Sequence, residues 1–437
     1  MSNFIIATED YAGLGFAVRL QDEGHRVILG FNPPAQTTRD RELCSRYSRV
    51  GEGMVEKAPL EELLRRREDL RDTYWIWDSN HSTEENELLR AEHYYVLGGG
   101  LHCNKMEHDR KACLEFVDRH GLQSPPSFRF EKAEDAISFC AEHPDAAYVY
   151  KPDSGDKFET FLPEAEDTTE ANSELRLHLQ SLSENGGPKC PFLLQERKDG
   201  IETNVEVWFN RGRPVFAFMS LECKKRYVLD LGELSGCAFD YVFTIPLESR
   251  AVQESVGKLF AAYEQMRYTG FGDANFIAAK DGVWFLEKCE RFGYNAHPNL
   301  FWNLAKRGTG EILISLIDGG FTPDFAEGFG ASVTMSTKEN CPPGKALQFP
   351  AKIGLDLYFY DVYRRGDVNL IAGYDSAGDV LLVNGYGYTM PTAWETIMKK
   401  AAEVRFPYRH YRPDGDQTNF PSSPIRRYEA LKAMGYI

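Results

Sequence analysis

Charged side chains gather at residues 284–291, where the sequence reads WFLEKCER. The apolar residues 284–286 predict a buried strand. Four charged residues follow within five positions: Glu287, Lys288, Glu290 and Arg291. A buried charge is costly unless it is paired or bound to a metal, so the pattern has two interpretations. Either the strand emerges into solvent here, or it delivers a carboxylate to a functional site.

A predicted hairpin brings further oxygen ligands close to Glu287. Asn275 lies twelve residues earlier, and a turn at Asp281–Gly282 would place the two residues across a strand pair. Asp273 precedes Asn275 by two positions and would point to the same face. Carboxylate and amide oxygens suit Mg²⁺, so these three residues predict a metal site. The alternative is a charged strand end that pairs with neighbouring cations.

Two lysines flank a glycine-containing loop in the segment YVYKPDSGDK. Lys151 ends an apolar run, and Lys157 follows a short loop that contains Ser154 and Gly155. Lysines supply positive charge, and glycine lets backbone amides approach a ligand closely, so this combination suits a triphosphate. The alternative interpretation is a pair of solvated lysines at a turn.

Composition limits the classes of protein that this chain can represent. A chain of 437 residues is too long for one compact core, so two to four domains or subdomains are expected. The formal net charge of −16 argues against a broad nucleic-acid-binding surface. No apolar run could span a bilayer, the N-terminus does not resemble a signal peptide, and nine cysteines form no CxxC pair. We therefore expect a cytoplasmic protein with reduced thiols and no membrane partner.

The first hundred residues alternate apolar runs with polar, helix-compatible segments. This alternation predicts a small parallel βαβ sheet, which would bind ligands at the carboxyl ends of its strands. The predicted strands are residues 3–8, 25–31, 73–78 and 94–99.

The remaining chain predicts helices, strands and a change of texture near residue 330. A helix is expected over 107–122, strands over 190–197 and 203–210, and the clearest amphipathic helix over 251–268. After residue 330 short strands alternate with glycine turns, which indicates a separate β-rich domain. The polar segment 412–424 is expected to be a mobile tail.

The order and spacing of these segments resemble the ATP-grasp ligases, and among them most closely the phosphoribosylamine–glycine ligase (glycinamide ribonucleotide synthetase) family. Five segments carry the resemblance: FVDRHGLQSPPSFRF, YVYKPDSGDKFETF, LLQERKDGIETNVEVWF, WFLEKCERFG, and the stretch from GDVLLVNGYGYT to YRPD. The resemblance implies an α/β (α+β multidomain) fold. It would comprise an N-terminal βαβ pre-ATP-grasp domain (1–100), an ATP-grasp domain (101–330) with a mobile lid at about 125–195, and a C-terminal β-rich domain (331–437).

The resemblance also implies ATP and Mg²⁺ as cofactors, with Mn²⁺ as an alternative metal. The implied metal ligands are Glu287 and Asn275, to which the hairpin spacing adds Asp273. The implied catalytic residues are Arg291 and Lys157. Lys151 would contact the α- and β-phosphates. The other implied nucleotide contacts are Ser154, Gly155 and Lys157 in the loop, Gln195, Glu196 and Glu202, and Arg110 or Lys111, which straddle the family's first lysine.

Several positions depart from the family's pattern. Cys289 replaces an asparagine on the metal-binding strand, and residues 293–296 lack two acids that the family carries. The first βα turn, which serves the ribose phosphate in the family, contains Glu9 and Asp10 here. These carboxylates would repel a phosphate, although Asp10 could instead cap the following helix.

The predicted function is an ATP-dependent carboxylate–amine ligase that acts through an acyl phosphate. It would join a small-molecule carboxylate, an amino acid, to an amine acceptor other than phosphoribosylamine. A modified nucleotide or base remains open as acceptor, and the sequence does not predict an oligomeric state. The alternative is a catalytically degenerate ATP-grasp protein that serves as a nucleotide-responsive binding or assembly module.

Overall fold

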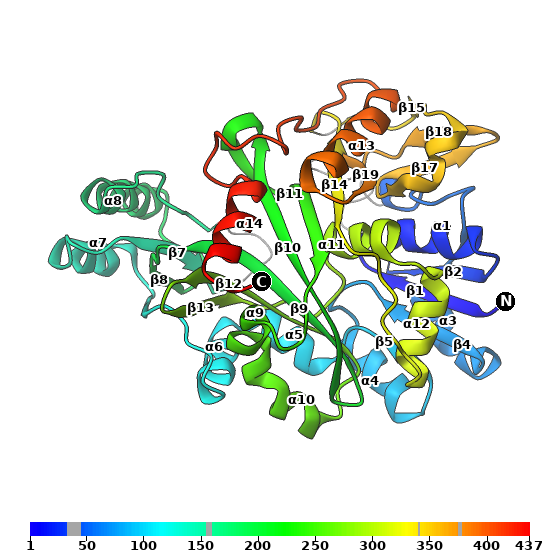
Figure 1. The fold of residues 1–437 in the computed structure, drawn as a ribbon, viewed down its shortest axis with the longest axis horizontal. Helices are drawn as coiled ribbons and strands as arrows, with labels where there is room; N and C mark the ends of the chain where they lie inside the picture. Colours follow the sequence, from blue (N-terminus) through cyan, green and yellow to red (C-terminus); the bar gives the residue numbers. More distant parts are fainter. Residues whose placement is uncertain (33–44, 154–159, 340, 375–377) are drawn as a thin grey trace.

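A computed structural model describes residues 1–32, 45–153, 160–339, 341–374 and 378–437 (Figure 1). The chain folds into four β-sheets flanked by helices, in the mixed α/β arrangement that the sequence predicts. In this described part, no helix is both long enough and apolar enough to cross a membrane.

The N-terminal sheet has five parallel strands in the order β3-β2-β1-β4-β5. The four predicted strands are confirmed, whereas β3 was missed because its short sequence, EKAP, carries no apolar run. Because the strands are parallel, their carboxyl ends and the polar turns that follow them share one edge. The elements are β1 (Asn3–Thr8), α1 (Leu14–Asp22), β2 (Arg26–Phe31), β3 (Glu56–Pro59), α3 (Leu60–Arg65), η1 (Arg67–Leu70), β4 (Thr73–Trp77), α4 (Thr83–Ala91) and β5 (Tyr95–Leu97).

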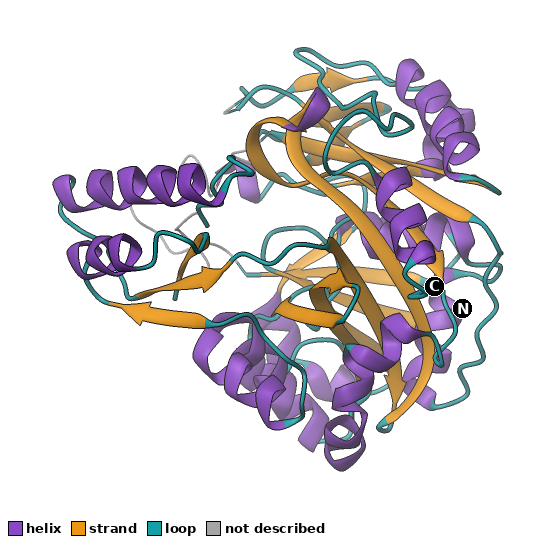
Figure 2. Cartoon of the chain, turned by 60° about the vertical axis from the view of Figure 1, so that its left-hand side comes forward, coloured by secondary structure: helices purple, strands orange, loops and turns teal. Residues whose placement is uncertain are grey.

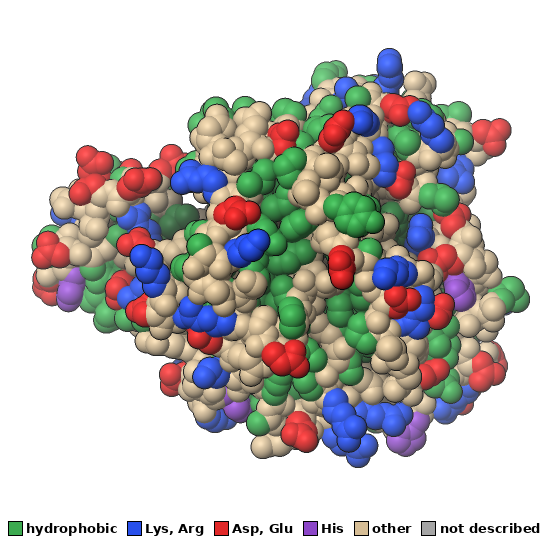
Figure 3. Space-filling view, in the orientation of Figure 1, with side chains coloured by type: hydrophobic (Ala, Val, Ile, Leu, Met, Phe, Trp, Pro, Cys, Tyr) green, Lys and Arg blue, Asp and Glu red, His purple; other side chains and the backbone are tan. Residues whose placement is uncertain are grey.

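A small three-stranded sheet and two helices form a lobe that projects from the body, at the left of Figure 1. Figure 2 shows the same lobe from another side. It has its own apolar core, built around buried residues such as Phe192, Leu194 and Leu175. Acidic side chains cover much of its outer end (Figure 3). The elements are β6 (Ser127–Phe130), α7 (Ala133–Glu142), β7 (Tyr148–Pro152), α8 (Thr168–Glu184) and β8 (Phe192–Glu196).

An eight-stranded sheet in the order β13-β12-β9-β10-β11-β14-β19-β16 forms the centre of the molecule. It continues across residue 330, because β11 pairs with β14 and β14 pairs with β19. The division into domains at residues 100 and 330 stays a prediction. The strands are β9 (Ile201–Asn210), β10 (Arg213–Tyr227), β11 (Leu231–Thr244), β12 (Gly270–Ala279), β13 (Gly282–Glu287), β14 (Phe329–Ser336), β16 (Leu357–Phe359) and β19 (Asp379–Gly387).

Helices and a second three-stranded sheet complete the C-terminal part. Helix α13 packs on β14 and β19, and α14 packs on β9 and β10. These elements are β15 (Lys345–Leu347), η5 (Ala351–Asp356), β17 (Val362–Arg365), β18 (Val368–Ile371), α13 (Met390–Glu403) and α14 (Pro424–Ala433). Further helices in the second half of the chain are η2 (Val228–Asp230), α11 (Ala296–Asn299), η4 (Leu300–Leu304) and α12 (Thr309–Asp318).

The segment 412–424 is anchored, so the prediction of a mobile tail was wrong. The Arg412 side chain is buried and donates to Asp414 at 2.7 and 2.9 Å and to Asp230 at 2.9 Å. Phe420 is also buried. The polar composition of the segment concealed this arrangement because its charges pair with each other and with a residue from η2.

Two predicted helices are each divided. The helix expected over 251–268 consists of α9 (Arg250–Glu254), η3 (Val256–Leu259) and α10 (Phe260–Met266), with a non-helical backbone at Ser255. The helix expected over 107–122 begins instead at Arg110, because the Asp109 side chain accepts a hydrogen bond from Ala112 N and caps α6 (Arg110–Arg119). A separate helix, α5 (Leu101–His108), precedes it, and the break places Arg110 in the first turn of α6.

Candidate active site

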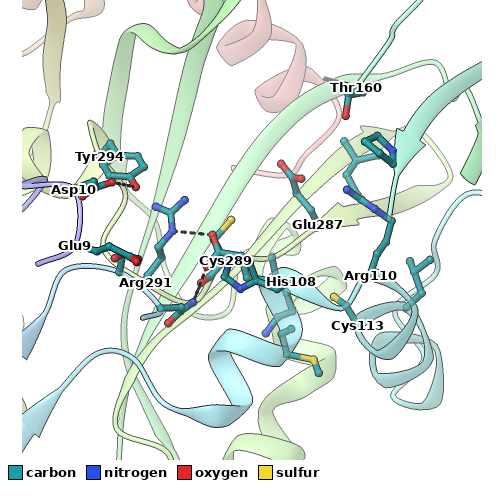
Figure 4. A pocket seen from close by; sticks show the side chains of 18 of the residues that line it. Glu9, Asp10, His108, Arg110, Cys113, Thr160, Glu287, Cys289, Arg291 and Tyr294 are labelled. Carbon is teal, nitrogen blue, oxygen red and sulfur yellow. Dashed lines mark hydrogen bonds and ion pairs between the residues drawn. The ribbon is translucent and has the colours of Figure 1, made fainter. Parts of the chain in front are cut away.

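A cleft of about 610 Å³ lies between the N-terminal sheet, α5 and α6, the lobe and the end of β13 (Figure 4). One end of the cleft is lined by residues of the N-terminal turns, and the other end by residues of α6 and the lobe. Its polar wall includes Glu9, Asp10, Asn80, Glu107, Arg110, Thr160, Glu287, Arg291 and Tyr294. Glu287 and Arg291 of the charged run therefore meet polar groups from the first hundred or so residues.

Glu287 ends β13 in the wall of this cleft and lies opposite Asn275 of β12, as the predicted hairpin requires. Partial desolvation within the cleft disfavours a charged carboxyl here, but the nearby cations of Lys224, Lys151 and Arg110 outweigh it and hold the pKa of Glu287 below its usual value. Glu287 is therefore ionised at neutral pH. An ionised carboxylate surrounded by cations can bind a metal ion together with a polyphosphate.

Lys151 lies on β7, immediately before Pro152 of the cleft wall, and is 9% exposed. Burial lowers the pKa of its ammonium to about 8, and the carboxylate of Glu287 opposes this shift. Lys151 therefore carries its charge at neutral pH but can lose it in mildly alkaline solution.

If Lys151 binds phosphate, ATP affinity should depend on pH in this range. Folding lowers the Lys151 pKa, so the charged form is complete well below pH 8 and is lost as pH rises through 8. We expect affinity to fall by up to about tenfold per pH unit above 8. Calorimetric titrations between pH 7 and 9.5 test this. A Lys151→Arg variant, whose guanidinium stays charged, should show a flat profile; an equally steep profile in that variant would assign the titration to another group.

Glu202 and Lys224 extend the charged cluster behind Glu287. Their side chains approach to 3.2 Å, and Lys224 lowers the pKa of Glu202, whose side chain is half exposed. The pKa of Lys224 is raised by Glu202. The sequence singled out Glu202 but missed Lys224, which lies on the neighbouring strand β10.

The side chain of Asp273 supports the segment after β13 by binding backbone N–H groups of that segment. Its Oδ1 accepts hydrogen bonds from the N–H groups of Cys289 at 2.8 Å and Glu290 at 2.7 Å, and the side chain is only 5% exposed. Burial raises the pKa of Asp273 to about 7. The described residues contain no group of three or more His, Cys, Asp or Glu side chains arranged to hold a metal ion. The geometry thus gives Asp273 a positioning contact, and its predicted role as a metal ligand has no direct support.

The charges after β13 divide between the cleft and the interior. Lys288 and Glu290 are fully buried, where Lys288 pairs with Glu290 and Tyr263 donates a hydrogen bond to Glu290. His102 Nε2 lies 3.4 Å from the Glu290 carboxylate. Glu287 and Arg291 line the cleft with their polar groups, and Lys288 also belongs to the lining although its ammonium pairs with Glu290. Neither interpretation of the charged run is therefore complete, because two of its four charged side chains pair with each other inside the protein.

Arg291 is held at the middle of the cleft by two neighbours. Its Nε lies 2.9 Å from Glu107 of α5, and its guanidinium lies 4.6 Å from the centroid of the Tyr294 ring. Asn80 joins this group, because its Nδ2 donates to Glu107 at 2.9 Å and to the Cys289 carbonyl at 2.6 Å. The sequence reasoning missed Glu107 and Asn80, and no local pattern marks either residue.

Of the remaining predicted nucleotide contacts, three do not line the cleft and three lie outside the described residues. Gln195 is 2% exposed and donates to Ser127 at 3.2 Å, and Glu196 pairs with Lys198 at 2.6 Å. Neither residue, nor Glu202, lines the cleft. Ser154, Gly155 and Lys157 lie outside the described residues. The predicted roles of these six residues therefore stay predictions.

Arg110 and Lys111 occupy different environments, which separates the two candidate positions. Arg110 lines the cleft and acts on Lys151 and Glu287, whereas the Lys111 side chain is 76% exposed and lies 3.9 Å from Glu115. We expect Arg110→Ala to weaken ATP binding by roughly tenfold and Lys111→Ala to leave it unchanged. Titration calorimetry on both variants checks this. The reverse ranking would show that Lys111, and not Arg110, is the nucleotide contact on α6.

Comparisons with known proteins identify the fold. No protein-family model matches the sequence, and a search of curated proteins finds no match. Solved structures do match over nearly the whole chain, and their enzymes share the ATP-grasp fold. The chain therefore has the ATP-grasp fold, and the predicted fold class is confirmed.

Three of these neighbours illustrate the likeness. Phosphoribosylamine–glycine ligase from Thermotoga maritima is 16% identical, with a TM-score of 0.69 and coverage of 94% of this chain and 99% of that chain. Biotin carboxylase from Campylobacter jejuni is 12% identical, with a TM-score of 0.63 and 98% coverage of both chains. N5-carboxyaminoimidazole ribonucleotide synthetase from T. maritima is 14% identical, with a TM-score of 0.56 and coverage of 93% and 99%.

Proposed function

We propose that this chain is an ATP-dependent, ADP-forming carboxylate–amine ligase. The observation that carries the proposal is the cluster at the end of β13, where ionised Glu287 faces the cations of Lys151 and Arg110 in an ATP-grasp fold. One neighbour, the Campylobacter biotin carboxylase, was solved as a β,γ-ATP complex. We place the nucleotide phosphates of this chain at the same charged cluster.

The proposed reaction has two steps. A carboxylate oxygen of the first substrate attacks the γ-phosphorus of ATP, so that an acyl phosphate forms and ADP leaves. The amine nitrogen of the second substrate then bonds to the acyl carbon, and phosphate leaves with one of the carboxylate's oxygens. Lys151 and Arg110 would balance the triphosphate charge, and Arg291 would orient the acyl phosphate. An amino acid is the proposed carboxylate substrate.

Glu287 and Asn275 supply oxygen donors that fit Mg²⁺, with Mn²⁺ as the alternative. Bound there, the metal ion would neutralise charge on the phosphates. Cys289 does not add to this donor set, because burial holds the pKa of its thiol well above its usual value and a neutral thiol is a poor ligand for a hard cation.

The acceptor is proposed to be an amine other than phosphoribosylamine. A phosphate group needs free backbone amides, which a glycine turn at a helix N-terminus commonly supplies. Here the Ala12 N–H donates to Asp10 at 3.0 Å, and the Gly13 N–H donates to buried Asp78 at 2.7 Å. Asp10 does not cap α1, whose N-cap is Gly13 without a side-chain cap, so the capping alternative was wrong. Both amides are nevertheless already engaged by carboxylates of this chain.

Phosphoribosylamine should therefore be a poor substrate. We expect that phosphoribosylamine generated in situ, with glycine and Mg·ATP, yields glycinamide ribonucleotide at less than about one-hundredth of ordinary enzyme rates. Mass spectrometry of the product checks this, with a known phosphoribosylamine–glycine ligase as the positive control. Robust turnover would make the turn after β1 a phosphate site after all.

The chain is also proposed to divide at residues 100 and 330 and to work in the cytoplasm, where its eight described cysteines, all free, would stay reduced.

The second candidate function is a degenerate ATP-grasp protein that binds nucleotide without turnover. Cys289 on the metal strand, and the absence of a three-residue metal cluster in the described chain, favour this candidate. ADP release from Mg·ATP in the presence of amino acids separates the two, because only the ligase releases ADP.

A further inference from the structure

The two ends of the cleft carry opposite charge. Lys151 and Arg110 lie near Glu287 at one end, whereas Glu9 and Asp10 line the other end, on the left of Figure 4. Arg291 stands between them and is engaged by Glu107 at 2.9 Å. A polyphosphate and a second substrate that share this cleft would therefore meet different fields, and the second substrate meets a negative one.

Asp10 is fixed in a position where it can receive a cation. Its Oδ1 accepts the Ala12 N–H at 3.0 Å, and its Oδ2 accepts the Tyr294 hydroxyl at 2.6 Å. Both contacts hold the carboxylate at the cleft wall without neutralising it. The Tyr294 ring, which is 38% exposed, lies beside it and could contact an organic cation through its face.

Asn80, in the group around Arg291 at the middle of the cleft, gives an independent indication that the second substrate donates hydrogen bonds. Asn80 lines the cleft and is only 5% exposed. Both contacts of its Nδ2, to Glu107 and to the Cys289 carbonyl, go to pure acceptors, so the orientation of the amide is determined. Among the described residues its Oδ1 has no hydrogen-bond partner. A buried acceptor without a partner is costly, and an amine N–H would satisfy it.

We propose, on the basis of the ligase function above, that the amine acceptor carries a second positive charge, as a diamine or a basic amino acid does. The reacting nitrogen, in its neutral form, would donate an N–H to Asn80 Oδ1, and the distal ammonium would lie against Asp10. On reaction the nitrogen bonds to the acyl carbon, phosphate leaves with the bonding electron pair, and the nitrogen's proton passes to solvent or phosphate.

Calorimetry with simple amines tests this recognition apart from turnover. The probes are 1,4-diaminobutane, n-butylamine with one amine, and the anion ribose 5-phosphate, each titrated with and without a non-hydrolysable ATP analogue. We expect the wild type to bind the diamine at least tenfold more tightly than butylamine and to show no binding of ribose 5-phosphate. Asp10→Asn, which keeps an oxygen for the Ala12 N–H, should abolish the preference for the diamine.

Two further variants serve as matched controls. Asp72→Asn removes one negative charge at an exposed position directly before β4, outside the cleft lining, and should leave all three affinities unchanged. Tyr294→Phe frees the Asp10 Oδ2 and should strengthen diamine binding about threefold. No diamine binding under either condition, an unchanged preference in Asp10→Asn, or tighter binding of ribose 5-phosphate would overturn this inference. Absence of Mg·ATP binding to the wild type would instead overturn the ligase proposal.

Discussion

Replacing Lys151 with alanine is expected to lower ATP affinity by roughly 10- to 100-fold while the protein stays folded. The estimate corresponds to the loss of one charge-assisted hydrogen bond of about 1.5–3 kcal/mol to a phosphate. The physical reason is the position of Lys151, which is 9% exposed at the end of β7 and interacts with Glu287 and Arg110. Its removal also leaves Glu287 with one fewer neighbouring cation.

Titration calorimetry with ATP and Mg²⁺ measures this effect, and circular dichroism verifies the fold. Lys132→Ala is a suitable control, because Lys132 belongs to the same lobe, at the start of α7, and is exposed. The control should bind ATP like the wild type. An unchanged ATP affinity in a folded Lys151→Ala protein would remove Lys151 from the nucleotide site.

Glu287→Gln and Glu290→Gln are expected to fail in different ways, although the residues are only three positions apart. Glu287 lines the cleft, so its amide variant should fold normally but require at least about tenfold more Mg²⁺ for ATP use. Glu290 is fully buried and paired with Lys288, so its variant should lose about 3–5 kcal/mol of unfolding free energy and keep the Mg²⁺ requirement.

ADP release across a magnesium series gives the Mg²⁺ requirement of both variants, and urea unfolding gives their free energy of unfolding. The pair of variants controls for charge, because each loses one carboxylate from the same segment. Equal magnesium dependence, or a larger effect at Glu290, would mean that the carboxylate of the metal strand has been misidentified.

The hairpin of β12 and β13 shows what the sequence alone could predict. A turn near Asp281–Gly282 places Asn275 and Glu287 close together across the hairpin, as the sequence predicts, whereas their direct pairing also needs a register shift between Asn275 and Phe276 that counting does not reveal. The parallel sheet followed from short apolar runs in the same way. Both features depend on neighbours that are near in sequence, and a local pattern records them.

The contacts that complete the site could not be predicted in this way. Glu107 and Asn80 reach Arg291 and Cys289 across 184 and 209 positions of chain. Asp273 was assigned to the metal, yet its oxygen accepts two backbone N–H groups, because the segment after β13 turns back over β12. The spacing of Asp273 and Asn275 gives no information about that turn, which includes a positive φ of 42° at Glu290.

Long-range pairing also explains the error at the C-terminus. The segment around Arg412 looks like a solvated tail because it is rich in Pro, Asp and Ser. Its arginine is nevertheless buried against Asp230, a residue 182 positions earlier in the chain. The composition of this segment indicates a preference for solvent exposure. The residue that buries its arginine instead, Asp230, lies on a distant element and leaves no trace in that composition.

Trapping the acyl phosphate with hydroxylamine tests the ligase proposal most directly, because it needs no knowledge of the natural amine. The wild-type protein is incubated with Mg·ATP, hydroxylamine and each amino acid in turn, and hydroxamates are measured by mass spectrometry together with ADP. We predict that at least one amino acid gives a hydroxamate in an amount equal to the ADP formed, and that Glu287→Gln gives far less. Mg·ATP binding without hydroxamate or ADP from any amino acid would contradict the ligase proposal and favour a nucleotide-responsive binding protein.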